Sequence, residues 1–318
     1  MEALGYIVLR FSNEQVFNQT RETLASIAET CIRTINRAPK PPTNAVPDSP
    51  LPEGEGRGVR ASRLGGEGLH IRPKPILLLH ATGTNRDRDA ALACELAGGA
   101  PEIVTVNQLV RGERHVRDYA MLVIPGGFSY GDDLGAGVLW ALDLRERIPG
   151  IEEFVRAGKP VLGICNGFQT LVKSGLLPGH AWDGGARSVT LTYNERGRFE
   201  CRWVTLHANL DSPCLFTEGL EEPIHAPIAH GEGRVMVADE ATRERLWEDG
   251  LAALTYGGSD YPENPNGSID AIAGLCNPEG NVFGLMPHPE NHIFPWQHPQ
   301  RVHGYSGLRL FENGIRRA

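Results

Sequence analysis

The stretch Pro160-Val-Leu-Gly-Ile-Cys165-Asn-Gly-Phe-Gln169 predicts an apolar strand that runs into a cysteine and then into a helix. Gly163 and Gly167 flank Cys165 two residues before and after it, where a sharp strand-to-helix turn leaves no room for side chains. Such a nucleophile elbow holds the sulfur at the sheet edge, where free N–H groups and the helix dipole favour a thiolate. The alternative is a buried cysteine at the end of a core strand, and the paired glycines disfavour it.

A base for this cysteine is found near the C-terminus, in Phe283-Gly-Leu-Met-Pro-His-Pro-Glu290. Residues two apart on an extended backbone point to the same side, so Glu290 can orient the imidazole of His288. His288 can then take the proton of Cys165. Alone, this segment would be typical of a surface loop. Together with the elbow, it predicts a catalytic triad of Cys165, His288 and Glu290.

A third apolar run, Met121-Leu-Val-Ile-Pro-Gly-Gly-Phe-Ser129, also ends in glycines. Glycines let the backbone approach a substrate closely. We therefore expect the N–H groups of Gly127 and Phe128 to join that of Asn166 in an oxyanion hole. Alone, the same residues would indicate only a Gly-Gly turn.

Short apolar runs alternate with helical patterns from Pro73 onward, which predicts an α/β fold with a mainly parallel central sheet and helices on both faces. Alternating runs in the second half predict further sheet, some of it antiparallel. The expected strands are Ile76 to His80, Glu102 to Val106, Ala120 to Ile124, Pro160 to Ile164, Ser188 to Tyr193, Glu200 to His207, Ile224 to Ile228, Leu251 to Tyr256 and Ile269 to Leu275. Two of the expected helices are Arg86 to Leu96 and Ile151 to Ala157.

The composition changes along the chain of 318 residues. Residues 1–36 are interpreted as a short extension of unknown role, residues 37–72 as a flexible linker rich in Pro and Gly, and residues 73–318 as the catalytic domain. The formal net charge of −8 gives no general attraction to nucleic acid or to an anionic membrane. The N-terminus has no signal-peptide pattern and no stretch approaches a membrane-spanning length, so a cytoplasmic location is expected.

The six cysteines are scattered without close pairs, which disfavours a disulfide framework or a Cys-x-x-Cys metal site. Five of them, all except Cys165, are expected to be small buried apolar residues. Asp132 and Asp133 are interpreted as helix caps and dipole partners rather than as metal ligands. His292 and His298 are interpreted as surface or packing residues. No metal site is expected.

The cysteine elbow, the Pro-Gly-Gly turn and the final His-Pro-Glu together resemble class I, triad-type glutamine amidotransferases. More narrowly, five segments resemble the glutaminase subunits of phosphoribosylformylglycinamidine synthases. They are PGGFSYGDDLGAG (125–137), GICNGFQ (163–169), PIAHGEGR (227–234), YPENPNGS (261–268) and GNVFGLMPHPE (280–290). The segment GTNRD (83–87) fits the same family, and the resemblance extends from about Lys74 to the C-terminus.

The resemblance implies a flavodoxin-like three-layer α/β/α domain and the same triad. It implies hydrolysis of glutamine to glutamate through a cysteine thioester, with ammonia delivered to a synthetase subunit. That subunit would use ATP and magnesium to convert formylglycinamide ribonucleotide to formylglycinamidine ribonucleotide in purine (IMP) biosynthesis, usually with a small bridging subunit. No cofactor is expected on this chain, because its sequence has no Gly-x-x-x-x-Gly-Lys-[Ser/Thr] loop.

Several matched residues are assigned either to the glutamine pocket or to a partner interface, namely Gln169, His230, Arg234, Asn264 and Asn266. Two other functions remain open from the sequence. One is a stand-alone Cys-His γ-glutamyl hydrolase or peptidase of the same fold. The other is a non-catalytic interaction module.

Overall fold

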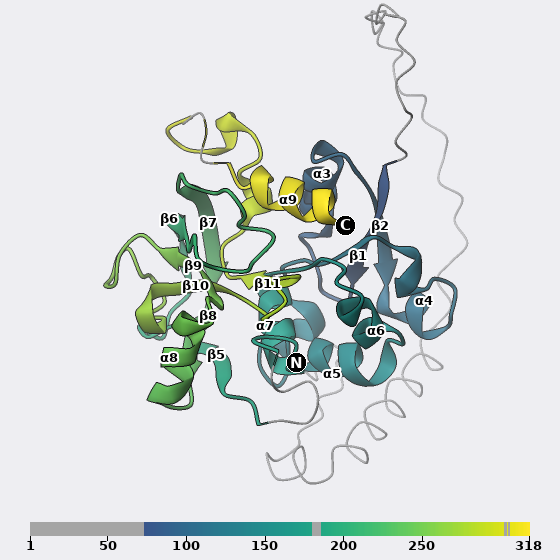
Figure 1. The fold of residues 1–318 in the computed structure, drawn as a ribbon, viewed down its shortest axis with the longest axis horizontal. Coiled ribbons are helices and arrows are strands. Elements are labelled where there is room, and N and C mark those ends of the chain that lie inside the picture. The colour runs from purple at the N-terminus through teal and green to yellow at the C-terminus, as the bar shows by residue number, and fades with distance from the viewer. Residues whose placement is uncertain (1–72, 180–185, 302–303, 305) are drawn as a thin grey trace, which may run out of the picture. The chain divides into compact units, whose positions relative to one another are not determined.

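The computed structural model describes residues 73–179, 186–301, 304 and 306–318. The expected extension and linker, residues 1–36 and 37–72, lie outside these described residues. The described chain is built on a nine-stranded sheet with the order β2-β1-β3-β4-β11-β10-β9-β6-β7 (Figure 1). A second sheet pairs β5 with β8.

One half of the large sheet is parallel and has the flavodoxin-like order β2-β1-β3-β4-β11. Apart from the edge strand β2, its strands are short apolar runs, and Ile76 to Leu79 are fully buried. A strand covered by helices on both faces needs such a continuous apolar run. The strands are β1 (Lys74–His80), β2 (Gly99–Thr105), β3 (Met121–Ile124), β4 (Val161–Ile164) and β11 (Val282–Leu285).

Helices lie on both faces of this parallel half (Figure 1). On one face α3 (Asp87–Leu96) packs against α9 (Leu308–Arg317). On the other face lie α5 (Val138–Leu142), α6 (Ile151–Arg156) and α7 (Asn166–Ser174), while α4 (Val106–Val110) contacts β2. The expected three-layer α/β/α domain is confirmed.

The other half of the sheet is antiparallel, as the alternating runs predict. It contains β10 (Ile272–Cys276), β9 (Ala252–Tyr256), β6 (Glu200–Ala208) and β7 (Ile224–His230). The separate pair consists of β5 (Val189–Tyr193) and β8 (Glu232–Val237), and α8 (Glu240–Glu248) follows β8. Short 3₁₀ or π-helical turns are η2 (Val116–Asp118), η3 (Ser129–Asp132), η4 (Asp143–Arg147), η5 (Ile269–Ala271), η6 (Pro289–Asn291) and η7 (Pro295–Gln297).

Three details of the sequence prediction are wrong. Asp132 does not cap a helix, because its carboxylate accepts a hydrogen bond from Asn166 and α5 begins after Gly137 with no side-chain cap. The strand expected from Ile269 begins only at Ile272, because Asp270 takes a positive φ of 50° in a turn where its carboxylate accepts hydrogen bonds from Arg243. Cys201 is exposed on β6 rather than buried, since its side chain alternates away from the core. Of the other four cysteines expected to be buried, Cys31 lies outside the described residues and the rest are buried.

His292 and His298 pack around Trp203, with ring centroids 5.3 and 4.5 Å from that side chain. Both histidines are buried, so packing rather than surface exposure describes them. Among the described residues, no group of three or more His, Cys, Asp or Glu side chains is arranged to hold a metal ion.

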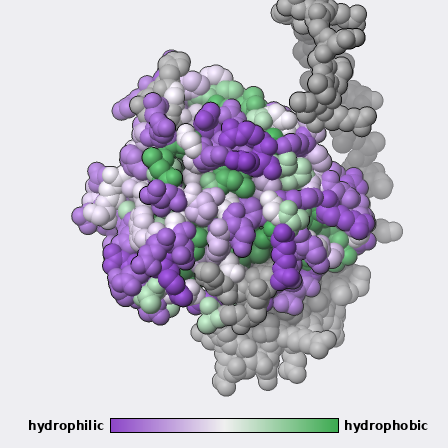
Figure 2. All heavy atoms as spheres, viewed as in Figure 1, coloured by the Kyte–Doolittle hydropathy of each residue, from purple (hydrophilic) through white to green (hydrophobic). Residues whose placement is uncertain are grey.

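The face of the described chain shown in Figure 2 is mostly hydrophilic, with small scattered apolar patches. Such a distribution is ordinary for a protein surface. No helix in the described part of the chain combines the length and apolarity needed to cross a membrane.

Candidate active site

Cys165 occupies the sharp turn between β4 and α7. Its backbone has φ 53° and ψ −105°, a combination that costs energy for a residue with a side chain. The turn is held by a hydrogen bond from the Cys165 N–H to the Leu285 carbonyl, at 2.8 Å, and by one from the Gln169 N–H to the Cys165 carbonyl, at 3.1 Å. Strain of this kind is typical of a nucleophile elbow.

The two glycines around Cys165 are required by close backbone contacts. A Cβ atom on Gly163 would lie 2.7 Å from the Gly167 carbonyl oxygen, and one on Gly167 would lie 1.9 Å from the Ile124 carbonyl oxygen. Real Cβ atoms do not approach other atoms so closely. The steric explanation of the flanking glycines is therefore confirmed.

We expect Gly167→Ala to destabilise the chain by about 3 kcal/mol or more, because a backbone carbonyl cannot yield to the added methyl group as a flexible side chain would. Gly231→Ala is the matched control for stability, since its Cβ would have Phe199 as its nearest neighbour at 3.9 Å. Thermal unfolding of both variants measures the difference. Equal melting temperatures would contradict the close packing at this turn.

His288 and Glu290 follow the end of β11, the strand beside β4. The His288 N–H donates to the Pro227 carbonyl at 2.8 Å, which anchors the segment on β7. His288 Nδ1 lies 2.7 Å from Glu290 Oε1, and both side chains are buried. An ionised carboxylate only accepts hydrogen bonds, so Nδ1 is the donor and Nε2 remains for the hydrogen bond to Cys165.

The electrostatics of the pair favour a charged imidazole. Burial lowers the pKa of His288, but attraction to Glu290 and Cys165 and hydrogen bonds to both outweigh it and raise the pKa to about 10. His288 is therefore protonated at neutral pH. An imidazolium beside the sulfur suits a cysteine nucleophile.

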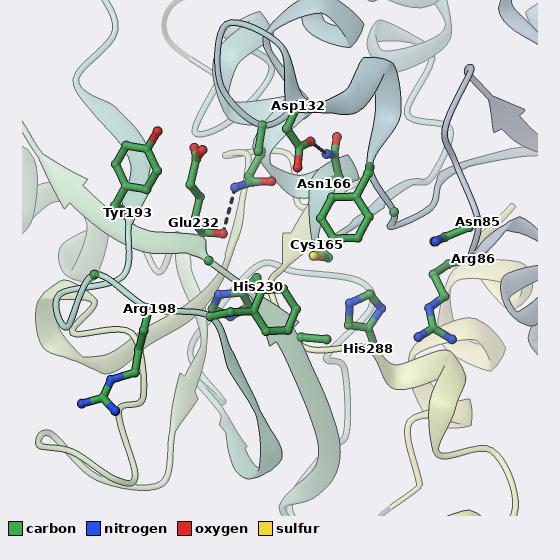
Figure 3. Close-up of a pocket in the computed structure, with 18 residues that line it drawn as sticks. Asn85, Arg86, Asp132, Cys165, Asn166, Tyr193, Arg198, His230, Glu232 and His288 are labelled. Carbon is green, nitrogen blue, oxygen red and sulfur yellow. Dashed lines mark hydrogen bonds between the residues drawn. The ribbon is translucent and has the colours of Figure 1, made fainter. Parts of the chain in front are cut away.

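An open pocket of about 450 Å³ leads to Cys165 and His288 (Figure 3). The three residues expected to supply oxyanion donors, Gly127, Phe128 and Asn166, also line it. The pocket therefore brings together the cysteine, the histidine and these three residues. Its other lining residues are Asn85, Arg86, Asp132, Ala136, Gln169, Tyr193, Gly197, Arg198, Phe199, Ala229, His230, Gly231 and Glu232.

Two further sequence candidates, Gln169 and His230, line the pocket. Gln169 Nε2 donates to the Glu232 carbonyl at 3.0 Å. His230 is buried, and its Nδ1 lies 3.1 Å from Asn194 Oδ1. Burial and the nearby charge of His288 lower the pKa of His230 to about 3, so His230 is neutral at physiological pH.

The structure places Arg234, Asn264 and Asn266 outside the pocket lining. Arg234 donates to the Gly267 carbonyl and pairs with Glu195. The two asparagine amides are buried and donate to backbone carbonyls, Asn264 within its own turn and Asn266 across to β8. These contacts brace the segment between β9 and β10 against β8.

Several pocket residues were not identified as candidates from the sequence. Asn85 and Arg86 belong to the matched GTNRD segment, and Asp132 and Glu232 belong to the matched FSYGDD and HGEGR segments, so the resemblance was a signal for these four. Three further lining residues belong to no matched motif. Tyr193 ends β5, and Arg198 and Phe199 lie in the connection between β5 and β6.

Comparison with known proteins agrees with this geometry. Residues 73–316 match the model of the CobB/CobQ-like glutamine amidotransferase domain. The chain belongs to this glutamine amidotransferase family. A phosphoribosylformylglycinamidine synthase subunit PurQ from Treponema denticola is 55% identical to this amidotransferase over 243 residues, which make up 70% of this chain and 89% of that protein. The subunit of the same name from Dehalococcoides mccartyi is 40% identical over 254 residues, 76% of this chain and 96% of that protein.

Among solved structures, a chain of PurLQS from Thermotoga maritima is 34% identical, with a TM-score of 0.59. The match covers 77% of this chain and 98% of that one. The resemblance of this amidotransferase to the glutaminase subunits of phosphoribosylformylglycinamidine synthases is therefore confirmed.

Proposed function

We propose that this amidotransferase is the glutaminase subunit of a phosphoribosylformylglycinamidine synthase. The observation that carries the proposal is the buried constellation of Cys165, His288 and Glu290 at the base of an open pocket. The similarity to subunits named PurQ supports the substrate and the pathway. Residues 73–318 would contain the whole catalytic unit, because the family match begins at residue 73.

In the proposed reaction, Cys165 Sγ attacks the side-chain amide carbon of glutamine and forms a tetrahedral intermediate. His288 gives its proton to the nitrogen as the carbon–nitrogen bond breaks, which releases ammonia and leaves a γ-glutamyl thioester. Water then gives a proton to His288 and adds to the thioester, and glutamate leaves as Cys165 is regenerated. Glu290 stabilises the imidazolium through its 2.7 Å hydrogen bond to Nδ1.

The negative oxygen of each tetrahedral intermediate needs hydrogen-bond donors that are already in place. We assign that role to the backbone N–H groups of Gly127, Phe128 and Asn166. Gly127 has a φ of 123°, and a Cβ there would lie 2.7 Å from the Asn85 nitrogen, so only glycine fits.

Free glutamine carries an ammonium and a carboxylate besides its amide. The pocket supplies carboxylates from Asp132 and Glu232 and guanidinium groups from Arg86 and Arg198, which Figure 3 shows on different sides of Cys165. We assign the ammonium to the acidic pair and the carboxylate to an arginine. Opposite charges at the two ends favour free glutamine over the same amide within a peptide chain.

The ammonia is proposed to pass to a separate synthetase subunit, with a small bridging subunit completing the complex in the cytoplasm. ATP and magnesium would bind to the synthetase, since the sequence of this chain has no nucleotide-binding loop. The rim of the pocket offers a surface for such a partner, because Phe128, Tyr193 and Phe199 are 52, 68 and 52% exposed. Exposed aromatic side chains are enriched at protein interfaces.

The experiment that tests the proposal measures glutamate release by the purified chain, first alone and then with synthetase, formylglycinamide ribonucleotide and ATP. We expect slow hydrolysis by the chain alone and an increase of about tenfold or more in the complex, because loops around a site often reach catalytic geometry only on assembly. Formation of the amidine in step with glutamate release would show that the ammonia is delivered.

Two outcomes would favour the other functions. A rate for the chain alone that already equals the rate in the complex, with γ-glutamyl peptides cleaved as fast as glutamine, would indicate a stand-alone hydrolase. No glutamate release under either condition would indicate an interaction module.

A further inference from the structure

The side chain of Asn166 connects the two segments that we expect to supply oxyanion donors. Its Oδ1 accepts a hydrogen bond from Ser129 Oγ at 2.7 Å, and its Nδ2 donates one to Asp132 Oδ1 at 2.7 Å, the latter drawn in Figure 3. Asn166 and Ser129 are each 2% exposed. The residue directly after Cys165 is therefore bound through both ends of its amide to the turn η3, which follows Gly127 and Phe128.

The segment around η3 has a conformation that needs such a restraint. Tyr130, Asp132 and Leu134 have positive φ values of 54°, 55° and 65°, which residues with side chains rarely adopt. A backbone of this kind persists only where surrounding contacts fix it. Besides Asn166, contacts that do so include the hydrogen bond from the Tyr130 N–H to the Thr82 carbonyl, at 2.6 Å, and the one from the Tyr130 hydroxyl to Asp143.

An amide is well suited to this pair of contacts, because it carries an acceptor and a donor on one planar group. Ser129 presents a hydroxyl donor and Asp132 presents a carboxylate acceptor, so the connecting side chain must accept at one end and donate at the other. Leucine has the size but neither function, and aspartate can only accept when it is ionised. The requirement makes the role of Asn166 testable by substitution.

We propose that Asn166 is a positioning residue that sets the two halves of the oxyanion hole by means of one side chain. Its amide holds the segment of Gly127 and Phe128 at a fixed place relative to the Asn166 backbone N–H. The inference rests on the proposed glutaminase function. Phe128 and Leu134 on this segment are 52 and 55% exposed. A partner protein that contacts them would therefore act on the oxyanion hole through the hydrogen bonds of Asn166, which gives a route for regulation.

The first test is Asn166→Leu in the full chain, assayed as glutamate release in the presence of synthetase, nucleotide and formylglycinamide ribonucleotide. We expect kcat to fall about 100-fold with little change in KM, because the misplaced donors act on the charge of the transition state. Amidation with added ammonia reports whether the synthetase is active, and co-elution of the chain with the synthetase in size-exclusion chromatography reports whether the complex still assembles. Asp133→Asn is the control, since Asp133 is exposed and lies outside both the pocket lining and the Asn166 contacts.

The second test exchanges the two functional groups. Asn166→Asp places a carboxylate oxygen against Asp132 where the amide nitrogen lay at 2.7 Å, and we expect it to lower kcat as Asn166→Leu does. The double variant with Asp132→Asn again pairs a donor with an acceptor and has the net charge of the original. At saturating glutamine we expect kcat to recover by about tenfold or more over Asn166→Asp, with a raised KM because Asp132 is also assigned to the ammonium of the substrate. A side chain that merely fills space would show no such recovery.

The inference is overturned if Asn166→Leu keeps the original kcat, or if the double variant is no better than Asn166→Asp. The comparison of Asn166→Asp with the double variant tests the positioning role even if Asn166→Leu fails to fold, because these exchanges barely change the size of the side chains. Thermal unfolding reports whether each variant is folded. Failure of the proposed function is distinguishable, because it appears in the unsubstituted chain, either as no glutamate release or as release by the chain alone at the rate of the complex. An inactive Cys165→Ser together with a fully active Asn166→Leu removes only the positioning role.

Discussion

Cys165→Ser is expected to abolish glutamine-dependent activity, with a fall in glutamate release of at least about 10⁴-fold. A serine hydroxyl is a much weaker nucleophile than a thiolate, and no acyl intermediate forms without attack on the amide carbon. The substitution changes one atom in a residue that is 7% exposed, so the fold and the pocket are retained. The loss therefore reports the chemistry of the sulfur.

The synthetase reaction with added ammonia should be unaffected in the same variant, because only the nitrogen source is lost. Cys201→Ser is the matched control, since Cys201 is exposed on β6 and lies outside the pocket lining. The measurements are glutamate release and amidine formation with glutamine and with ammonia. If Cys165→Ser still releases glutamate at a rate close to that of Cys201→Ser, another residue is the nucleophile.

The elbow was predictable from the sequence because its determinants are local. Gly163 and Gly167 are needed by contacts with the neighbouring turn and with the end of β3, and both contacts follow from a strand that turns directly into a helix. The spacing of His288 and Glu290 is local in the same way, since two residues on one short segment form the 2.7 Å contact. The central parallel strands were predictable because burial on both faces requires continuous apolar runs.

The pocket wall was not predictable by the same means. Tyr193, Arg198 and Phe199 reach it because β5 pairs with β8, which is not among the strands predicted from the sequence. β8 has no continuous apolar run, and its residues alternate between buried and half-buried positions. Pairing between segments about 40 residues apart is set by tertiary packing, which local periodicity does not encode.

Matched motifs marked important residues without giving their roles. Asn264 and Asn266 belong to the segment YPENPNGS, yet both are buried and hydrogen-bonded to backbone carbonyls rather than placed in the pocket. A buried amide that satisfies backbone groups is as constrained as one that binds a substrate. Asn166 shows the opposite case, since its backbone was expected to matter and its side chain makes the contacts that connect two segments.

Glu290→Gln is expected to lower kcat by about 10² to 10⁴-fold while the chain still folds. Glu290 is 1% exposed and nearly isosteric with glutamine, so the change removes the negative charge and not the volume. Without that charge, the imidazolium at His288 loses its principal stabilising partner. A glutamine can also turn its NH₂ group toward Nδ1, which then has to accept a hydrogen bond, and the ring is held in the wrong tautomer. Glu248→Gln on the exposed surface of α8 is the control.

The pH dependence makes this prediction specific. Attraction to Glu290 and Cys165 raises the pKa of His288 to about 10 against the opposing effect of burial. A raised pKa means that the protonated imidazole persists to higher pH, so activity that needs this proton should decline only as the pH approaches 10. In Glu290→Gln the attraction is weaker and burial still acts, which lowers the pKa of His288 and moves the alkaline decline of kcat to lower pH. If kcat of Glu290→Gln declines at the same alkaline pH as kcat of the original chain, Glu290 does not stabilise the imidazolium.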